Sequence, residues 1–193
     1  MLGSTQPEEQ ADPVRAGERG VALARRRTGG GAVLVDIVDP VWIDLWLPVD
    51  DPLVSPDLGR SFNWLGETWV TALDALGLRG LSSRRGGVFR TEWSGLVCFA
   101  GWGRGEVFDP DGRKVVGLAQ RRTRFGSWFQ SACLVQWDPS LLLDTLSLSG
   151  PQRARARREL AGVAAGVGDL GATVMSGVAA HAAVTAVLLE SLP

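Results

Sequence analysis

The chain carries only one lysine, two cysteines and one histidine, and each of these residues could take part in chemistry at a site. Lys114 is the single lysine among 20 basic residues, and it stands in the stretch GRKVVGLAQ at 112–120. A lysine ammonium is a compact point charge on a flexible stem, which the planar guanidinium of arginine does not reproduce. Facing a site, Lys114 could hold a carboxylate or phosphoryl oxygen; chance use of lysine for a solvated charge is the alternative.

The residues around Lys114 read as a strand. Side chains alternate between the two faces of a strand, so Lys114 would share a face with Val116 and Leu118. Gly117 in the middle of this strand indicates a bulge or a close approach of another segment. We also expect replacement of Lys114 to leave the fold intact, since a lysine at a site contributes little to a core.

The two cysteines and the histidine have different expected roles, as a nucleophile or as structural residues. Two cysteines are too few for a disulfide framework, their spacing fits no zinc pattern, and one histidine cannot build a histidine-based site, so no metal site is expected. Cys133 lies in an apolar strand and is expected to pack in the core, and His181 on an Ala-rich helix is expected to be structural. Cys98 is either a nucleophile or a small buried apolar residue.

A glycine-rich loop is the second candidate feature, in the stretch RRRTGGGAV at 25–33. Three consecutive glycines, Gly29–Gly31, indicate unusual φ values or a very close backbone approach. Successive backbone N–H groups in such a turn can form an anion-binding concavity, and the adjacent arginines add positive charge. A plain hairpin turn with a solvated basic flank is the alternative. The loop is not a P-loop, because no Gly-Lys-Ser/Thr follows it.

These residues must be positioned by a sheet and its helices. The segment 41–48 alternates Val, Ile, Leu and Leu with Trp, Asp and Trp, which is the period of a strand. Turn sequences DPDG at 109–112 and RTRFG at 122–126 separate later strands. The order of elements predicts an α+β fold with a mixed, largely antiparallel sheet. The expected strands are a short one just before Arg25 and those at 32–36, 41–48, 96–100, 105–108, 113–122 and 127–137; the expected helices are at 57–77, 139–146, 152–165 and about 177–191.

Length and composition predict one domain over residues 1–193. A formal net charge of −1 gives no electrostatic case for nucleic-acid binding. The segment Leu170–Leu189 has no Asp, Glu, Lys or Arg, but it is rich in Gly and Ala, so we expect a helix packed on the domain and not a membrane span. The first residues carry no apolar signal core, so a cytoplasmic location is expected.

The stretches RRTGGGAV (26–33) and GRKVVGLAQR (112–121) together resemble the biotin and lipoate protein ligase superfamily, and lipoate ligases most closely. That family carries an Arg-Arg, two residues, Gly-Gly-Gly-Ala-Val loop and a strand with an essential lysine before a glycine. GSTQP at 3–7 resembles the loop that ends an early strand of the family, and the resemblance covers 1–192. It implies a catalytic Lys114 and a set of binding residues, namely Arg26, Arg27, Gly29, Gly30, Gly31, Ala32, Gly117 and Ala119.

As a ligase, the protein would attach lipoate or octanoate to a lysine through an acyl-adenylate, with ATP and Mg and lipoate as cofactors. Lys114 would hold carboxylate and α-phosphate oxygens as charge develops. The implied partner is the lipoyl carrier domain of a 2-oxoacid dehydrogenase or glycine cleavage complex, and no nucleic acid or membrane is expected as a partner.

Two alternatives remain. The stretch LVCFAGWGRGEVFDPDGRKVVG resembles octanoyltransferases of the same fold, in which Cys98 would be the acyl-accepting nucleophile, acyl carrier protein the donor, and no cofactor needed. The other alternative is a member that binds an acyl ligand or lipoyl domain without chemistry. Three departures from the family bear on this choice: Leu118 replaces a serine, WFQSACLV lacks the usual His-Gly, and the usual first strands and C-terminal accessory domain are missing from 1–193.

Overall fold

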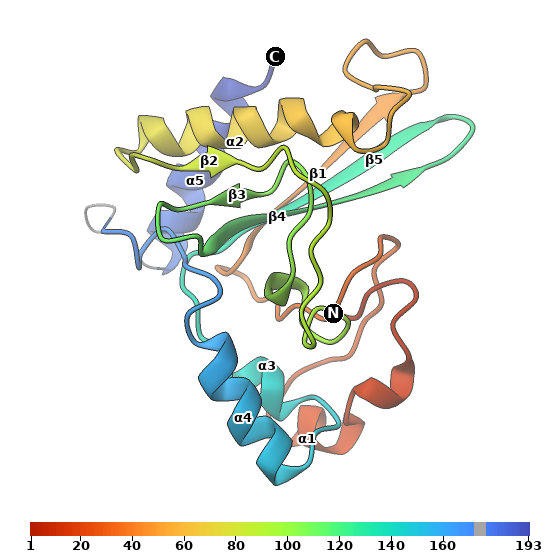
Figure 1. The fold of residues 1–193 in the computed structure, drawn as a ribbon, viewed down its shortest axis with the longest axis vertical. Coiled ribbons are helices and arrows are strands. Elements are labelled where there is room, and N and C mark those ends of the chain that lie inside the picture. Colours follow the sequence, from red (N-terminus) through yellow and green to blue (C-terminus); the bar gives the residue numbers. More distant parts are fainter. Residues whose placement is uncertain (172–176) are drawn as a thin grey trace.

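The computed structural model describes residues 1–171 and 177–193, so part of the segment Leu170–Leu189 lies outside the described residues. Its centre is a five-stranded sheet in which every neighbouring pair is antiparallel (Figure 1). The expected α+β class with a largely antiparallel sheet is confirmed. In spatial order the strands are β1 (Val41–Pro48), β5 (Gly126–Cys133), β4 (Lys114–Arg122), β3 (Val107–Phe108) and β2 (Ser82–Ser83).

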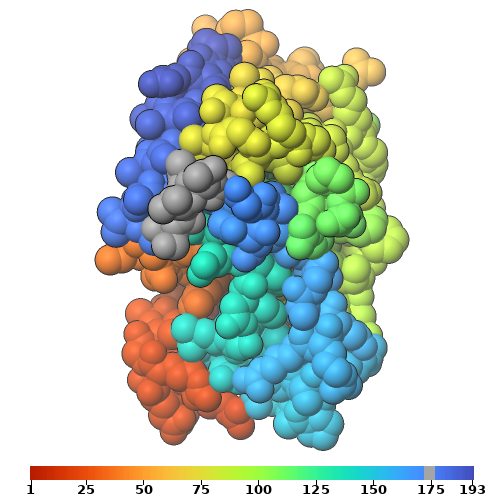
Figure 2. All heavy atoms as spheres, turned by 90° about the vertical axis from the view of Figure 1, so that its left-hand side faces the viewer, coloured from red at the N-terminus to blue at the C-terminus, as the bar shows by residue number. Residues whose placement is uncertain are grey.

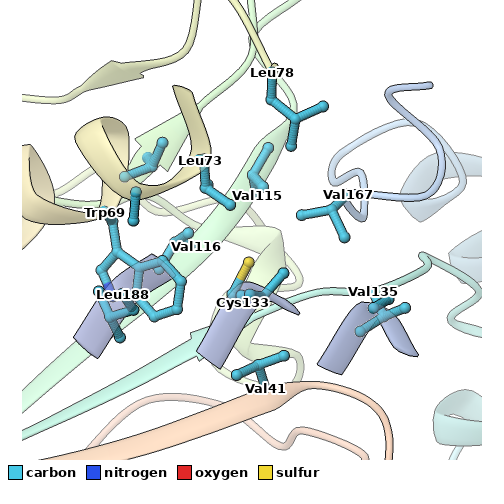
Figure 3. Packing of buried hydrophobic residues seen from close by; sticks show 14 of the residues in the cluster. Val41, Trp69, Leu73, Leu78, Val115, Val116, Cys133, Val135, Val167 and Leu188 are labelled. Atoms are coloured by element: carbon cyan, nitrogen blue, oxygen red, sulfur yellow. The ribbon is translucent and has the colours of Figure 1, made fainter. Parts of the chain in front are cut away.

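Helices α2 (Asn63–Ala75) and α5 (Gly177–Ser191) cover one face of the sheet, and the main core lies between them and the strands (Figure 1). Figure 3 shows Trp69 of α2 and Leu188 of α5 packed beside Val116 and Cys133 of the strands. The alternation expected in β1 is confirmed, since its odd-numbered residues face this core while Trp46 is 53% exposed on the other face. Burying one face of each element is what makes a short sheet stable.

Three short helices form the other end of the molecule: α1 (Pro13–Glu18), α3 (Ser140–Asp144) and α4 (Gly150–Leu160). In Figure 2 the N-terminal residues (red) and α4 (light blue) form the lower end, with α2 (yellow) and α5 (dark blue) at the upper end. A second apolar cluster joins Leu2 and Ala11 to α3 and α4. Helix α4 is shorter than expected, and it starts with a capping box between Ser149 and Gln152.

Three expected strands are wrong. The residues just before Arg25 and those at 32–36 form no strand, and only isolated bridges occur there, between Leu2 and Arg25 and between Ala32 and Val97. The segment 96–100 is not a strand either, because Cys98–Ala100 forms the single 3-10 turn η3. Each of these segments pairs with a neighbour for about one residue and then turns. Ala32, Val33 and Val97 are buried without a ladder, whereas Leu23, just before Arg25, is 41% exposed.

The helix expected at 57–77 starts later than its apolar pattern indicates, at Asn63. Asp57 accepts backbone hydrogen bonds from Gly59 and Arg60, and the 3-10 turn η2 (Arg60–Phe62) leads into α2. Gly77 ends the helix with a φ of +84°, as expected for a glycine at this position. None of the described helices is long and apolar enough to cross a membrane.

Strand β4 contains a register shift that changes which face Lys114 occupies. Val107 of β3 pairs with Val116, whereas Phe108 pairs with Lys114, so Val115 is the extra residue of a bulge. Val115 and Val116 are both buried in the main core. The expectation that Lys114 shares a face with Val116 is therefore wrong, and Lys114 lies beside Gly117.

Candidate active site

The glycine loop has two glycines whose geometry excludes a side chain. Gly30 has a φ of +98°, which L residues rarely adopt. A Cβ on Gly31 would lie 2.6 Å from the Val97 backbone nitrogen, so this residue makes the close backbone approach expected from the sequence. The Thr28 hydroxyl donates a hydrogen bond to Gln130 and thereby ties the loop to β5. The loop is a packed element of the fold and not a plain hairpin turn.

This loop holds Cys98. The Ala32 N–H donates to the Leu96 carbonyl at 2.8 Å, and the Cys98 N–H donates to the Ala32 carbonyl at 2.9 Å. Ala32 itself is buried. Cys98 is half-buried, and its sulfur lies 3.8 Å from where a Cβ on Gly30 would be. Gly30 therefore lies beside the thiol and adds no side chain to its surroundings.

Lys114 is deeply buried, at 1% exposure, and all three of its ammonium hydrogens have an acceptor. Its Nζ lies 2.7 Å from Oε1 of Glu106 and donates to the carbonyls of Cys98 and Gly101, each at 3.1 Å. The expectation that Lys114 adds little to the fold is at odds with this environment. Removing one partner of a buried ion pair leaves an uncompensated charge, which costs about 3–5 kcal/mol.

Glu106 is the site residue that the sequence reasoning missed. It is 5% exposed, and its other carboxylate oxygen accepts from the Gly103 N–H at 2.6 Å. Its Oε1 also accepts from the Leu118 N–H at 3.3 Å. Glu106 and Lys114 thus fasten the 98–103 segment to β4. The available signal was one acidic residue at the start of an apolar strand preceding the single lysine.

Gly117 provides the space that Lys114 needs. A Cβ at Gly117 would lie 3.3 Å from Cε of Lys114 and 3.4 Å from the Phe99 ring. The Lys114 ammonium lies 5.0 Å from the centre of that ring, within cation–π range. The mid-strand glycine therefore marks a close approach, as expected.

A cavity of about 640 Å³ brings most of the predicted site residues together. This cavity, the Cys98 cavity, is large enough for a medium-length acyl chain. Apolar side chains line much of it, including Phe62, Phe89 and Trp102. Of the residues predicted from the sequence, its wall contains Gly29, Gly30, Gly31, Cys98, Lys114 and Ala119.

The structure separates the two predicted arginines from that wall. Arg27 is exposed and lines a second cavity, of about 690 Å³, beside Trp42, Trp46 and Trp128 on the open face of the sheet. Arg26 is buried behind the glycine loop, where its Nη2 donates to the Gly29 and Gly31 carbonyls at 2.7 and 2.9 Å. Arg26 therefore supports the loop from within.

The remaining candidate nucleophile and base lie elsewhere. Cys133 is fully buried in the main core, and burial raises the pKa of its thiol well above the ordinary range (Figure 3). His181 of α5 makes a polar contact with the Val38 carbonyl at 3.3 Å, outside the Cys98 cavity. Within residues 1–171 and 177–193, no three His, Cys, Asp or Glu side chains gather in a way that could hold a metal ion.

The cavity thus combines an accessible thiol, a buried ammonium already neutralised by a carboxylate, and an apolar lining. A thiolate is a strong nucleophile toward carbonyl carbon, and fixed positive groups nearby stabilise negative charge that develops during attack. This arrangement suits acyl transfer at a carbonyl group.

Comparisons with known proteins identify the family of the chain. The family described as lipoyl protein ligase A/B catalytic domain matches residues 1–192. The octanoyltransferase LipM of Moorella thermoacetica is 36% identical over 119 residues, which are 61% of this chain and 42% of that protein. The chain thus spans less than half the length of this curated relative.

Solved structures of lipoate protein ligases share the fold. A bi-partite ligase of Thermoplasma acidophilum, solved as part of a lipoylation system with its E2 lipoyl domain, has a TM-score of 0.71 and 25% identity, covering 98% of this chain and 64% of that one. A lipoate-protein ligase A bound with ATP has a TM-score of 0.63 at 22% identity, covering 98% and 65%, and supports the fold alone. The chain therefore belongs to the lipoyl protein ligase A/B catalytic domain family, a family of enzymes within the biotin and lipoate ligase superfamily.

Proposed function

We propose that this protein is an octanoyltransferase-like enzyme that moves a medium-chain acyl group from a thioester donor to a carrier lysine through Cys98. The observation that carries this proposal is the position of Cys98 in the wall of the apolar cavity, with its main chain held by Lys114. The likeness to an octanoyltransferase over 119 residues supports the same choice.

The neutral Lys114–Glu106 pair in the cavity wall favours a thioester over an acyl-adenylate at this position. Lys114 is paired with Glu106 at 2.7 Å, so the pair carries no net charge. An incoming phosphate would have to compete with this carboxylate for the ammonium. A thioester carbonyl brings no charge until the thiolate attacks, and it needs only a partial share of one ammonium hydrogen.

The first step forms the acyl-enzyme. The thiolate sulfur of Cys98 attacks the carbonyl carbon of the donor thioester, the carbonyl oxygen takes up the negative charge, and the carbon–sulfur bond to the donor then breaks. The donor leaves as a thiolate, which takes a proton from water. The Lys114 ammonium donates to the Cys98 and Gly101 carbonyls, and in this proposal it would stabilise the developing oxyanion by shifting one of these hydrogen bonds to it.

The second step transfers the acyl group. A neutral lysine amine of the acceptor attacks the Cys98 thioester carbonyl, an amide bond forms, and the bond to the Cys98 sulfur breaks. The amine loses one proton to water and Cys98 returns as a thiolate. We propose acyl carrier protein as the donor and a lipoyl carrier domain of a 2-oxoacid dehydrogenase or glycine cleavage complex as the acceptor, in the reducing cytoplasm that keeps a free thiol reduced.

A lipoate ligase activity is the second candidate. Arg90 and Arg104 line the Cys98 cavity, and neither makes an ion pair with any described residue. These arginines would hold phosphate oxygens of ATP if the protein were a ligase, and bound ATP would then activate the free acid. The fold shared with ligases supports this candidate.

Intact-mass spectrometry separates the candidates. With octanoyl-acyl carrier protein and no ATP, we expect one octanoyl group on Cys98, lost in Cys98→Ala and kept in Cys133→Ala. Transfer only with octanoate or lipoate and ATP, retained by Cys98→Ala, would establish the ligase instead. Acyl transfer from neither donor would leave the non-catalytic alternative.

A further inference from the structure

Arg26 is a buried cation without an anionic partner. It is 6% exposed, and none of the ion pairs among the described residues includes it. Its Nη1 is buried and has no hydrogen-bond partner among residues 1–171 and 177–193. Buried charges in proteins are almost always paired, so a buried guanidinium with no carboxylate partner points to an anion that binds there or forms there.

The group that meets this guanidinium is the thiol of Cys98. Nη2 of Arg26 lies 3.9 Å from the Cys98 sulfur, and its bonds to the Gly29 and Gly31 carbonyls fix the direction of the nitrogen. Gly30 has no side chain to separate the two groups, since a Cβ there would lie 2.8 Å from the same nitrogen. The glycine loop thus presents a buried positive charge to the sulfur.

Other charged groups near the thiol do not take this role. Lys114 approaches Cys98 through the main-chain carbonyl, and Glu106 neutralises its ammonium. The amino group of Met1 donates to the Val33 carbonyl at 2.7 Å; burial, and then repulsion from Arg26, lower the pKa of this amine. It is a second cationic group and not a counter-ion for the arginine.

We propose that Arg26 is the counter-ion of Cys98 in its thiolate form and so a positioning and activating residue for the nucleophile. An arginine close to a cysteine favours the thiolate, the form that attacks a carbonyl. The inference rests on the proposed function only where it assigns the thiolate to acyl transfer. The interaction between Arg26 and Cys98 can be measured without any acyl donor.

The test is the rate at which iodoacetamide alkylates Cys98, followed by mass spectrometry; the sulfur–carbon bond forms and iodide leaves. We expect Arg26→Gln to react about tenfold or more slowly than the native protein at pH 7, and within about twofold of it at pH 9.5, where an ordinary thiol is ionised without help. Arg121→Gln is the matched control, because it removes one positive charge from an exposed position on β4. We expect the control to react at the native rate.

Alkylation of Arg26→Gln at the native rate at pH 7 would overturn the proposal. Equal slowing at pH 7 and at pH 9.5 would also overturn it, because this result would mean that the reagent reaches the thiol less easily and not that the thiolate has lost its counter-ion. If Arg26→Gln does not fold, as judged by tryptophan fluorescence, Arg26→Lys decides. Arg26→Lys keeps the positive charge but loses the paired hydrogen bonds to the Gly29 and Gly31 carbonyls, so we expect its alkylation rate to stay within about threefold of the native rate. An alkylation rate about tenfold lower than native at pH 7 would refute the counter-ion role. Normal thiol reactivity without acylation by any donor would instead refute the proposed function.

Discussion

Removal of the Lys114 ammonium should destabilise the protein strongly. Lys114 and Glu106 are 1% and 5% exposed, and their charged atoms lie 2.7 Å apart. Removing one member of such a pair costs about 3–5 kcal/mol, out of a total stability of about 5–15 kcal/mol for a typical domain. We expect Lys114→Met and Glu106→Leu each to lower the free energy of unfolding by an amount in this range. The double variant should lose much less than the sum, because no charge is left buried.

Urea unfolding followed by tryptophan fluorescence measures this directly. With a denaturant dependence of about 2 kcal/mol per molar urea, each single variant should unfold at a urea concentration about 1.5–2.5 M lower. The coupling between the two substitutions should exceed about 2 kcal/mol, which is large for neighbouring residues. Additive losses, or a Lys114→Met variant within 1 kcal/mol of the native protein, would refute the buried pair as a structural element. Lys114→Arg should also lose stability, because the larger guanidinium does not fit three acceptors placed around one nitrogen.

Three further predictions concern single residues. Gly31→Ala should slow acylation of Cys98 about tenfold or more, because its added Cβ would lie 2.6 Å from the Val97 backbone nitrogen and would displace Cys98. Gly17→Ala is the control and should not slow acylation, because its Cβ meets nothing within 4 Å among the described residues. Equal acylation rates of the two variants, measured by mass spectrometry, would contradict this prediction. Cys133, fully buried with a raised pKa, should resist iodoacetamide in the folded protein and react only in urea; alkylation without denaturant would show that it is accessible. Burial raises the pKa of Asp39, so its contribution to stability is present at low pH and is lost as pH rises above about 3.9. Unfolding experiments from pH 3 to 6 should show the stability of the native protein falling relative to Asp39→Asn, and parallel curves would contradict the shift.

The spacing of apolar residues in the sequence was sufficient to predict those strands and helices that bury one face in the core. The alternation in β1 placed its odd-numbered residues in the core, and the spacing of Leu65, Trp69 and Leu73 placed the buried stripe of α2. The turn at 109–112 formed as its sequence indicates, with Gly112 at a φ of +80°. The strand expected at 96–100 is wrong because Cys98–Ala100 form a 3-10 turn, in which the Cys98 carbonyl accepts a hydrogen bond from Lys114, 16 residues away. No local signal carries that contact.

The sequence was sufficient to predict several residues of the site but not the contacts between them. The single lysine and the three glycines drew attention to Lys114 and the loop, and the structure places both in one cavity wall with Cys98. The role of Glu106 was not predictable, because its value lies in a pairing set by the bulge at Val115. A bulge depends on how two strands meet, and an alternating pattern read from one strand cannot show it.

The most direct test of the account is a chase of the acyl-enzyme. The protein is loaded with octanoyl-acyl carrier protein, freed of donor, and mixed with an unmodified lipoyl domain in the absence of ATP. The account predicts that Cys98 loses its octanoyl group while the domain gains one on its acceptor lysine, in equal amounts and on the same time course. An octanoyl group that stays on Cys98 while the domain is modified only after free acid and ATP are added would contradict transfer through this thiol.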